Sequence, residues 1–183
     1  KEILRKKAEE GVEVRLFYDD VGSIGFIDPK FVQELEEWGI QCRIFNPIVP
    51  MVNLFMNNRD HRKITVVDGQ VGFTGGYNLA DEYFNIHSPY GYWKDTGIRL
   101  RGEAVGTLTL LFLEMWHAMD DSPVRGLYNY LPRHWDRYTG QGYCAPYAYA
   151  PTDGLPLGED VYLNMIQSAT ESIYITTPYL IIT

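Results

Sequence analysis

The sequence predicts an α/β fold in which a mixed, largely parallel sheet is flanked by helices on both faces. Three observations lead to this prediction. Several short stretches alternate apolar and polar residues, as half-buried strands do. Other stretches repeat apolar residues every three or four positions, as amphipathic helices do. Residues 12–44 run strand, helix, strand, and such a unit joins two parallel strands through a covering helix.

The opening of the chain carries this unit in full. Residues 1–10 form a charged helical pattern that Gly11 ends. Residues 12–18 and 40–44 alternate as strands. Between them, residues 28–39 begin with Asp-Pro, which favours an N-cap and a first helical position, and end with Gly, which closes a helix.

A hairpin follows in the middle of the chain. Residues 63–67 are rich in β-branched side chains, Asp68-Gly69 is a hairpin turn signal, and residues 71–74 return as a second strand. Residues 78–84 then predict a short helix that begins close behind the second strand.

The second half of the chain alternates again between strand and helix patterns. We expect a strand over 93–101, an apolar helix over 103–121, and mostly loop over the Pro- and Tyr-rich region 122–158. A helix over 159–171 and a strand over 172–182 then repeat the helix–strand order of the opening.

This recurrence predicts two domains. Residues 1–158 form a first half that includes the loop region 122–158, and residues 159–183 begin a second, truncated half. The chain starts with Lys1 and stops within a strand-like run, so we expect a fragment of a longer parent protein.

Composition excludes several classes of function. The 183 residues hold 16 basic and 24 acidic side chains, a net charge of -8, which opposes broad nucleic-acid binding. Cys42 and Cys144 are too few for a disulfide framework and match no metal spacing. The most apolar stretch, residues 104–113, is too short to span a membrane. We expect no metal and no cofactor, and we interpret Asp19 and Asp20 as solvated loop charges.

The candidate chemistry begins at His61. On a strand, His61 and Lys63 share one face at a spacing of about 6.5–7 Å, so an imidazole and an ammonium can contact one phosphate group. Asp68 lies on the order of 16 Å from Lys63 along the strand. We therefore interpret Asp68 as a structural carboxylate that orders the Asp68-Gly69 turn.

The return strand of the hairpin brings a glycine pair back toward His61. Gly75 and Gly76 allow close backbone approach, and we expect them at the start of a helix, where free amides and the helix dipole favour an anion. Asn78 can add a neutral donor. These features predict a phosphate-binding site.

At this point the sequence resembles a known family. His61-x-Lys63-x-x-x-x-Asp68, followed by Gly75-Gly76-x-Asn78, is similar to the signature of the phospholipase D superfamily. The surroundings resemble the bacterial cardiolipin synthase family over residues 11–23, 45–47, 73–76, 81–83, 93–96 and 177–179.

The resemblance implies a metal-independent exchange of phosphodiesters. One His attacks phosphorus and forms a phosphohistidine, and a second His, from a second motif, protonates the leaving alcohol. Lys63 and Asn78 would hold the non-bridging oxygens. Asp95 matches the family's carboxylate partner of the histidine, which keeps the attacking nitrogen neutral. In a cardiolipin synthase, one phosphatidylglycerol is the donor, a second is the acceptor, and glycerol leaves.

The sequence departs from the family in carrying one motif. His87, His117 and His134 are not followed by Lys and Asp at the required spacing. Either the second motif lies in the remainder of the parent protein, or two subunits complete one site. In the first case we expect the fragment alone to be inactive or nearly so.

Other functions stay open on sequence grounds. A homodimeric phosphodiesterase or nuclease of the same superfamily is the first alternative, and a non-catalytic binding module is the second. The apolar stretches 47–56 and 83–93 either pack within the protein or contact acyl chains at a membrane surface. We expect the parent protein at a bacterial cell membrane, the fragment itself to be soluble, and no nucleic-acid partner.

Overall fold

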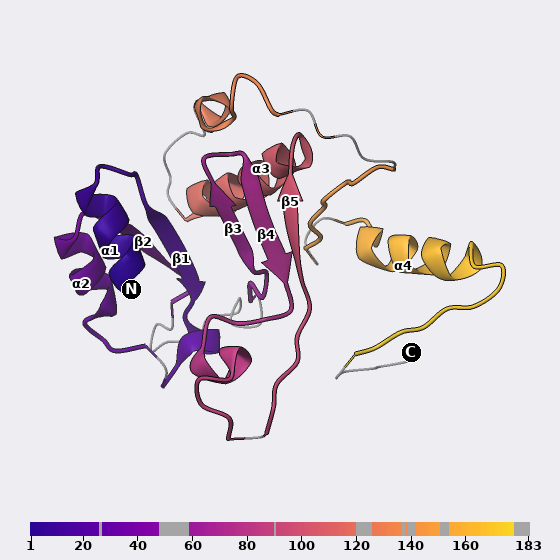
Figure 1. The fold of residues 1–183 in the computed structure, drawn as a ribbon, viewed down its shortest axis with the longest axis horizontal. Helices are drawn as coiled ribbons and strands as arrows, with labels where there is room; N and C mark the ends of the chain where they lie inside the picture. Colours follow the sequence, from indigo (N-terminus) through magenta and orange to yellow (C-terminus); the bar gives the residue numbers. More distant parts are fainter. Residues whose placement is uncertain are drawn as a thin grey trace. The chain divides into compact units, whose positions relative to one another are not determined.

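The computed structural model describes most of the chain. The described residues are 1–25, 27–47, 59–89, 91–119, 126–136, 138, 142–150 and 154–177. The chain divides into two compact units, Lys1–Ala145 and Pro146–Thr183, and each is described by itself. The first unit holds all the strands of the described residues (Figure 1). The predicted division into halves at residue 158 rests on the repeat alone and stays a prediction.

The predicted strand–helix–strand unit is confirmed. Strands β1 (Arg15–Asp19) and β2 (Gln41–Phe45) pair in parallel, with Asp19 opposite Phe45. Helix α1 (Glu2–Glu9) precedes β1, a short 3-10 helix η1 (Val21–Ser23) follows it, and helix α2 (Phe31–Glu37) packs beside β2.

Helix α2 begins later than the Asp-Pro signal predicts. The N-cap is Lys30 and not Asp28. The Asp28 carboxylate accepts a hydrogen bond from the Lys30 backbone N–H at 2.7 Å, and the Asp28 carbonyl accepts one from the Phe31 N–H. Asp28 therefore forms a turn that leads into the helix, which is a common use of aspartate.

The second sheet of this unit is antiparallel throughout. Strands β3 (Ile64–Val67), β4 (Val71–Gly75) and β5 (Gly97–Arg101) lie in that order (Figure 1). The largely parallel sheet that we predicted is not confirmed, because two of the three pairings among the described strands are antiparallel. The physical reason is local: a tight turn joins β3 to β4, and a turn of that length returns the chain in the opposite direction.

Helix α3 (Ala104–Ala118) supplies much of the core of this unit. It packs on β3, β4 and β5, so one face of the antiparallel sheet is covered by this helix. Its buried apolar side chains include Val105, Leu108, Leu113 and Trp116. An ideal Cβ on Gly72 of β4 would lie 2.7 Å from Leu108 Cδ1, so a glycine at this position lets helix and sheet approach closely.

Three predicted elements differ from the structure. The short helix after β4 is reduced to a 3-10 helix, η2 (Asp81–Phe84). The strand predicted over 93–101 starts only at Gly97. The region 122–158 contains a further 3-10 helix, η3 (Leu127–Tyr130), among its described residues.

The second compact unit contains helix α4 (Leu157–Gln167), close to the predicted helix. Residues 172–177 form no strand, and the rest of the strand predicted there lies outside the described residues. The strand half of the predicted repeat is therefore not observed. No helix within the described residues is both long and apolar enough to cross a membrane.

Candidate active site

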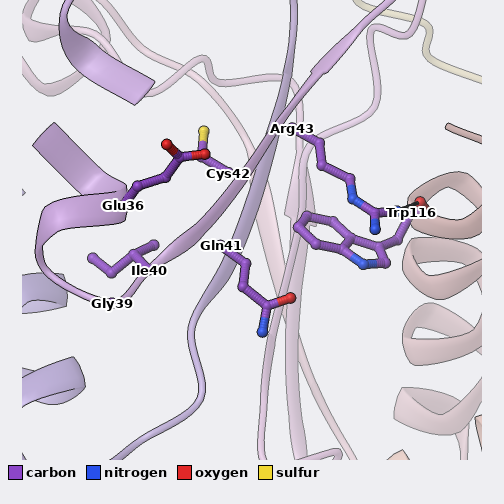
Figure 2. A pocket seen from close by; sticks show the side chains of 7 residues that line it. All are labelled: Glu36, Gly39, Ile40, Gln41, Cys42, Arg43 and Trp116. Atoms are coloured by element: carbon purple, nitrogen blue, oxygen red, sulfur yellow. Dashed lines mark hydrogen bonds between the residues drawn. The ribbon is translucent and has the colours of Figure 1, made fainter. Parts of the chain in front are cut away.

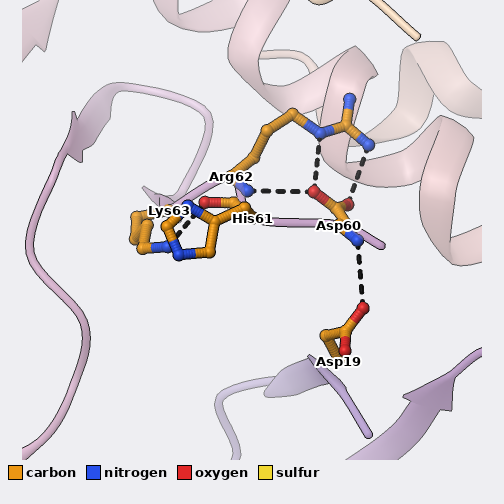
Figure 3. A network of polar contacts seen from close by, with 5 residues as sticks. All are labelled: Asp19, Asp60, His61, Arg62 and Lys63. Carbon is orange, nitrogen blue, oxygen red and sulfur yellow. Dashed lines mark hydrogen bonds and ion pairs between the residues drawn. The ribbon is translucent and has the colours of Figure 1, made fainter. Parts of the chain in front are cut away.

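The His61 segment lies immediately before β3. Figure 3 shows the His61 imidazole and the Lys63 side chain on one side of this segment, and the Asp60–Arg62 pair on the other. The shared face that we predicted for His61 and Lys63 is therefore present, although the strand itself begins one residue later, at Ile64. His61 is exposed, and the Lys63 Nζ donates a hydrogen bond to the His61 carbonyl oxygen at 2.6 Å.

The pKa of Lys63 differs from that of a solvated lysine. Burial lowers the pKa of its ammonium below the ordinary value of 10.5, and the negative charges of Asp60 and Asp95 act in the opposite direction. A partly buried ammonium beside an exposed imidazole is an arrangement that suits a phosphate group, because the anion restores the lost solvation.

Asp95 belongs to the same neighbourhood as Lys63. Its Oδ1 accepts a hydrogen bond from the Thr96 N–H at 2.7 Å, and its Oδ2 accepts one from Trp93 Nε1 at 3.2 Å. The pairing of Gly75 with Gly97 brings the residues before β5 beside the end of β4. The tertiary fold thus brings Asp95 within electrostatic reach of Lys63, 32 positions earlier in the chain.

The glycine pair is used differently from our prediction. No helix starts at Gly75 or Gly76, and the Gly76 N–H donates to the Thr96 carbonyl at 3.2 Å. The expected contribution of a helix N-terminus is therefore wrong. The sequence Gly-Gly is explained by crowding, since an ideal Cβ on Gly75 would lie 2.5 Å from the Thr96 carbonyl oxygen. A role of these glycines in phosphate binding stays a prediction.

Asn78 and Asp68 differ in where the fold places them. The Asn78 Nδ2 donates to the Tyr83 hydroxyl at 2.7 Å, which fixes the amide and leaves its second N–H for another acceptor. Asp68 lies in the turn at the opposite end of β3 from Lys63, where Asp68 and Gly69 both have positive φ, 53° and 65°. The predicted position of Asp68 in the turn is confirmed; what its carboxylate does there stays a prediction.

A charged network behind His61 was missed by the sequence analysis. It consists of Asp19, Arg59, Asp60 and Arg62. Asp19 was interpreted as a solvated loop charge, yet its side chain is only 10% exposed and accepts three hydrogen bonds. A signal was available, because Asp19 ends β1 at its carboxyl edge, where α/β folds place functional polar groups.

One hollow lies elsewhere. It has a volume of about 390 Å³ and is lined by Glu36, Gly39, Ile40, Gln41, Cys42, Arg43 and Trp116 (Figure 2). The Arg43 guanidinium lies over the Trp116 ring at 4.3 Å, and burial raises the pKa of the Cys42 thiol to about 11. None of the predicted site residues lines this hollow. Among the described residues, no group of three or more His, Cys, Asp and Glu side chains is placed to hold a metal ion.

Comparison with known proteins bears on this site directly. Residues 1–91 match the family model described as "Cardiolipin synthase, PLD-like domain". A cardiolipin synthase of Alkalihalophilus pseudofirmus is 40% identical over 182 residues, which are 99% of this chain and 36% of that protein. A cardiolipin synthase of Staphylococcus aureus strain Mu50 is 40% identical over 181 residues, which are 97% of this chain and 36% of that protein.

A third relative is longer than this chain in the same way. It is a protein of Streptococcus mutans serotype c named "Uncharacterized protein", 42% identical over 180 residues, which are 98% of this chain and 39% of that protein. The chain therefore spans under two fifths of the length of these relatives. The matches confirm the resemblance that the motif and its surroundings indicated.

Proposed function

We propose that this chain, whose residues 1–91 form a phospholipase D-like domain of the cardiolipin synthase family, supplies one motif-bearing half of a phosphatidyltransferase. The observation that supports this most is the pairing of an exposed His61 with a partly buried Lys63 on one side of a short segment. The substrate is an anionic phospholipid, phosphatidylglycerol, taken from a membrane surface. The names of the relatives agree with this substrate class.

The reaction proceeds in two displacements at phosphorus. In the first, an imidazole nitrogen of one motif histidine attacks the phosphorus of phosphatidylglycerol, a P–N bond forms, and the P–O bond to glycerol breaks. The second motif histidine gives its proton to the departing glycerol oxygen. In the second, a hydroxyl of another phosphatidylglycerol loses its proton to that histidine and attacks phosphorus. The P–N bond then breaks and cardiolipin is released.

The other site residues act on charge and orientation. Lys63 stabilises the negative charge on the non-bridging oxygens, and the second N–H of Asn78 contributes a further donor. The Gly75 and Gly76 backbone contributes at the same phosphate. Asp95 accepts a hydrogen bond from the imidazole N–H of His61 and so fixes its tautomer, while Asp68 maintains the hairpin turn.

A second histidine has to come from outside the motif described here. We propose that it lies in the remainder of a longer parent protein, which the length of the relatives supports. Residues 159–183 then begin that second half, residues 1–183 alone have little or no activity, and the parent protein works at the cell membrane. If two copies of the chain complete the site instead, the protein is a homodimeric phosphodiesterase.

The experiment uses the complete chain, with any segments that precede or follow residues 1–183. It is assayed on vesicles containing ³²P-labelled phosphatidylglycerol, and acid quenching is avoided so that phosphohistidine survives. We expect label on the protein and cardiolipin as product. His61→Ala should lower turnover by about 10³-fold or more. His134→Ala, which removes another exposed imidazole, is the matched control and should retain turnover.

The outcomes separate the candidates. Full turnover in His61→Ala excludes any role of this histidine in catalysis and favours the alternative that the domain is a non-catalytic binding module. Hydrolysis of a phosphodiester without transfer to a second lipid, together with a dimeric mass in light scattering, favours the homodimeric phosphodiesterase.

A further inference from the structure

We infer that Asp19 is a positioning residue for His61: its carboxylate fixes the backbone immediately before His61 and thereby sets where the imidazole stands. The inference rests on the proposed function of His61. It concerns a residue outside the His-Lys-Asp motif, 42 positions earlier in the chain, at the end of a different sheet.

Both oxygens of the Asp19 carboxylate are engaged. Asp19 Oδ2 accepts a hydrogen bond from the backbone N–H of Asp60 at 3.0 Å, as the dashed line in Figure 3 marks. Asp19 Oδ1 accepts one from the Gly22 N–H at 2.9 Å and one from Arg59 Nη1 at 3.2 Å. A carboxylate that is 10% exposed and holds three donors has a fixed orientation, so it defines the position of the Asp60 amide.

The backbone on the other side of His61 is held as well. The Asp60 side chain, 5% exposed, accepts a hydrogen bond from the Arg62 N–H at 3.0 Å and pairs with the Arg62 guanidinium at 2.9 and 2.8 Å. The His61 carbonyl oxygen accepts a hydrogen bond from the Lys63 ammonium. The amides on both sides of His61 and its own carbonyl are therefore all fixed, and Asp19 is the member that ties this group to β1.

Arg59 extends the connection to the neighbouring strand. Its Nη1 contacts Asp19, and its Nη2 donates to the Asn46 carbonyl at 3.1 Å, just beyond the end of β2. The His61 segment is thus attached to the carboxyl ends of both parallel strands. The strands β1 and β2 pair through backbone hydrogen bonds, so their pairing does not need the Asp19 carboxylate. The carboxylate instead contributes to where His61 lies.

The substitution Asp19→Asn isolates this role. It keeps the shape of the side chain and one acceptor oxygen, which can still serve Gly22 and Arg59. The amide nitrogen would replace Oδ2, so a donor would face the Asp60 N–H and the connection to the His61 segment would be lost. A displacement of about 1 Å at a reacting group can lower turnover by about 10²-fold.

The experiment measures kcat and KM of Asp19→Asn in the complete chain, on vesicles of phosphatidylglycerol. We expect kcat to fall by about 10- to 100-fold with KM within a factor of about two, because the substrate site is retained and only one of the two reacting histidines is misplaced. The labelled phosphohistidine should form more slowly in the same proportion. Asp28→Asn is the matched control, since Asp28 also accepts a backbone N–H, in the turn before α2, and it should leave kcat unchanged.

The outcomes distinguish this inference from the proposed function. If His61→Ala is inactive and Asp19→Asn keeps the wild-type kcat, the inference fails and the proposed function stands. If His61→Ala is active, the proposed function itself fails. If circular dichroism shows Asp19→Asn unfolded at the assay temperature in proportion to its lost kcat, the effect is one of stability and the inference is overturned.

Discussion

An ideal Cβ on Gly76 would lie 2.6 Å from the Oδ1 of Asp95, so the carboxylate occupies the space that any other residue at position 76 would fill. Asp95 cannot simply swing away, because Thr96 and Trp93 both donate to it. The second glycine of the Gly-Gly pair therefore leaves room for the Asp95 carboxylate. This relationship gives the first prediction.

Gly76→Ala should displace the Asp95 carboxylate and break at least one of its two hydrogen bonds. We expect the free energy of unfolding to fall by about 1–2 kcal/mol, and turnover by the complete chain to fall with it. Chemical denaturation and the vesicle assay check both. Gly158→Ala is the control, because an ideal Cβ there meets Tyr149 only at ordinary contact distances of 3.5 Å or more. Equal behaviour of the two variants would contradict the role assigned to Gly76.

Lys63 predicts a pH dependence of activity. In the role that we propose for it, the Lys63 ammonium has to be charged to hold a phosphate. Burial lowers its pKa below 10.5, so turnover should decline on the alkaline side at a pH below that value. Lys63→Arg keeps a cation whose pKa lies above about 12, so the alkaline decline should move to higher pH even if the maximal rate is lower. An alkaline limb that stays in place would assign it to another group. The pH–rate profile of both proteins is the measurement.

The same shift has a consequence for stability, with a definite sign. In the unfolded chain Lys63 has its ordinary pKa of 10.5, and in the folded protein the value is lower. Between the two values the unfolded chain binds more protons, so the contribution of Lys63 to the free energy of unfolding rises with pH in that window. At a pH below both pKa values, Lys63→Met should therefore have a higher free energy of unfolding than wild type. As the pH rises from the folded pKa to 10.5, this difference in the free energy of unfolding should become smaller.

Asp95→Asn should make the charged form of Lys63 less favourable. The negative charge of Asp95 raises the pKa of Lys63 against the effect of burial, so its removal lowers that pKa further. We expect the alkaline limb of turnover to move to lower pH, in addition to any loss of kcat from a misoriented His61. Asp136→Asn, which removes a carboxylate bonded to Tyr138, is the control and should leave the limb unchanged. A limb that is unmoved in Asp95→Asn would show that the two charges do not interact.

We predict that the stretch between η2 and β5 contacts a membrane. Ile86 and Tyr92 expose 74% and 85% of their surfaces, beside the segment that ends at Asp95. The double substitution of both by serine should weaken binding of the complete chain to vesicles, measured by flotation. Because the net charge of -8 disfavours anionic lipid, the loss should persist with zwitterionic vesicles.

The control for this prediction carries equal apolar exposure elsewhere. Ile3 and Tyr128 expose 78% and 82%, so their double substitution by serine removes a similar surface. If both double variants lose binding equally, the stretch before β5 has no special role. The other apolar stretch that we considered for acyl-chain contact, 47–56, lies outside the described residues from position 48 onward.

Part of this protein was readable from local pattern. The β1–α2–β2 unit, the β3–β4 hairpin and helix α3 follow from periodicity and from turn residues, because each is specified by neighbours within a few positions. The shared side of His61 and Lys63 was likewise predictable, since alternate residues of an extended chain point the same way. Local pattern did not predict that the sheets stay small, because strand pairing beyond one hairpin depends on contacts between distant segments.

The sequence by itself determined the motif, most of the helices and strands of the first unit, and the resemblance to the cardiolipin synthase family, because these reside in short-range spacing and in residue identity. Only the tertiary structure decided which distant groups meet the segment around His61 and Lys63. Asp95 reaches Lys63 because β5 pairs with β4, and Asp19 reaches the Asp60 amide because β1 ends beside that segment. The sequence does not distinguish a buried carboxylate from a solvated one, because burial and the number of hydrogen-bond donors around the carboxylate depend on how the chain folds.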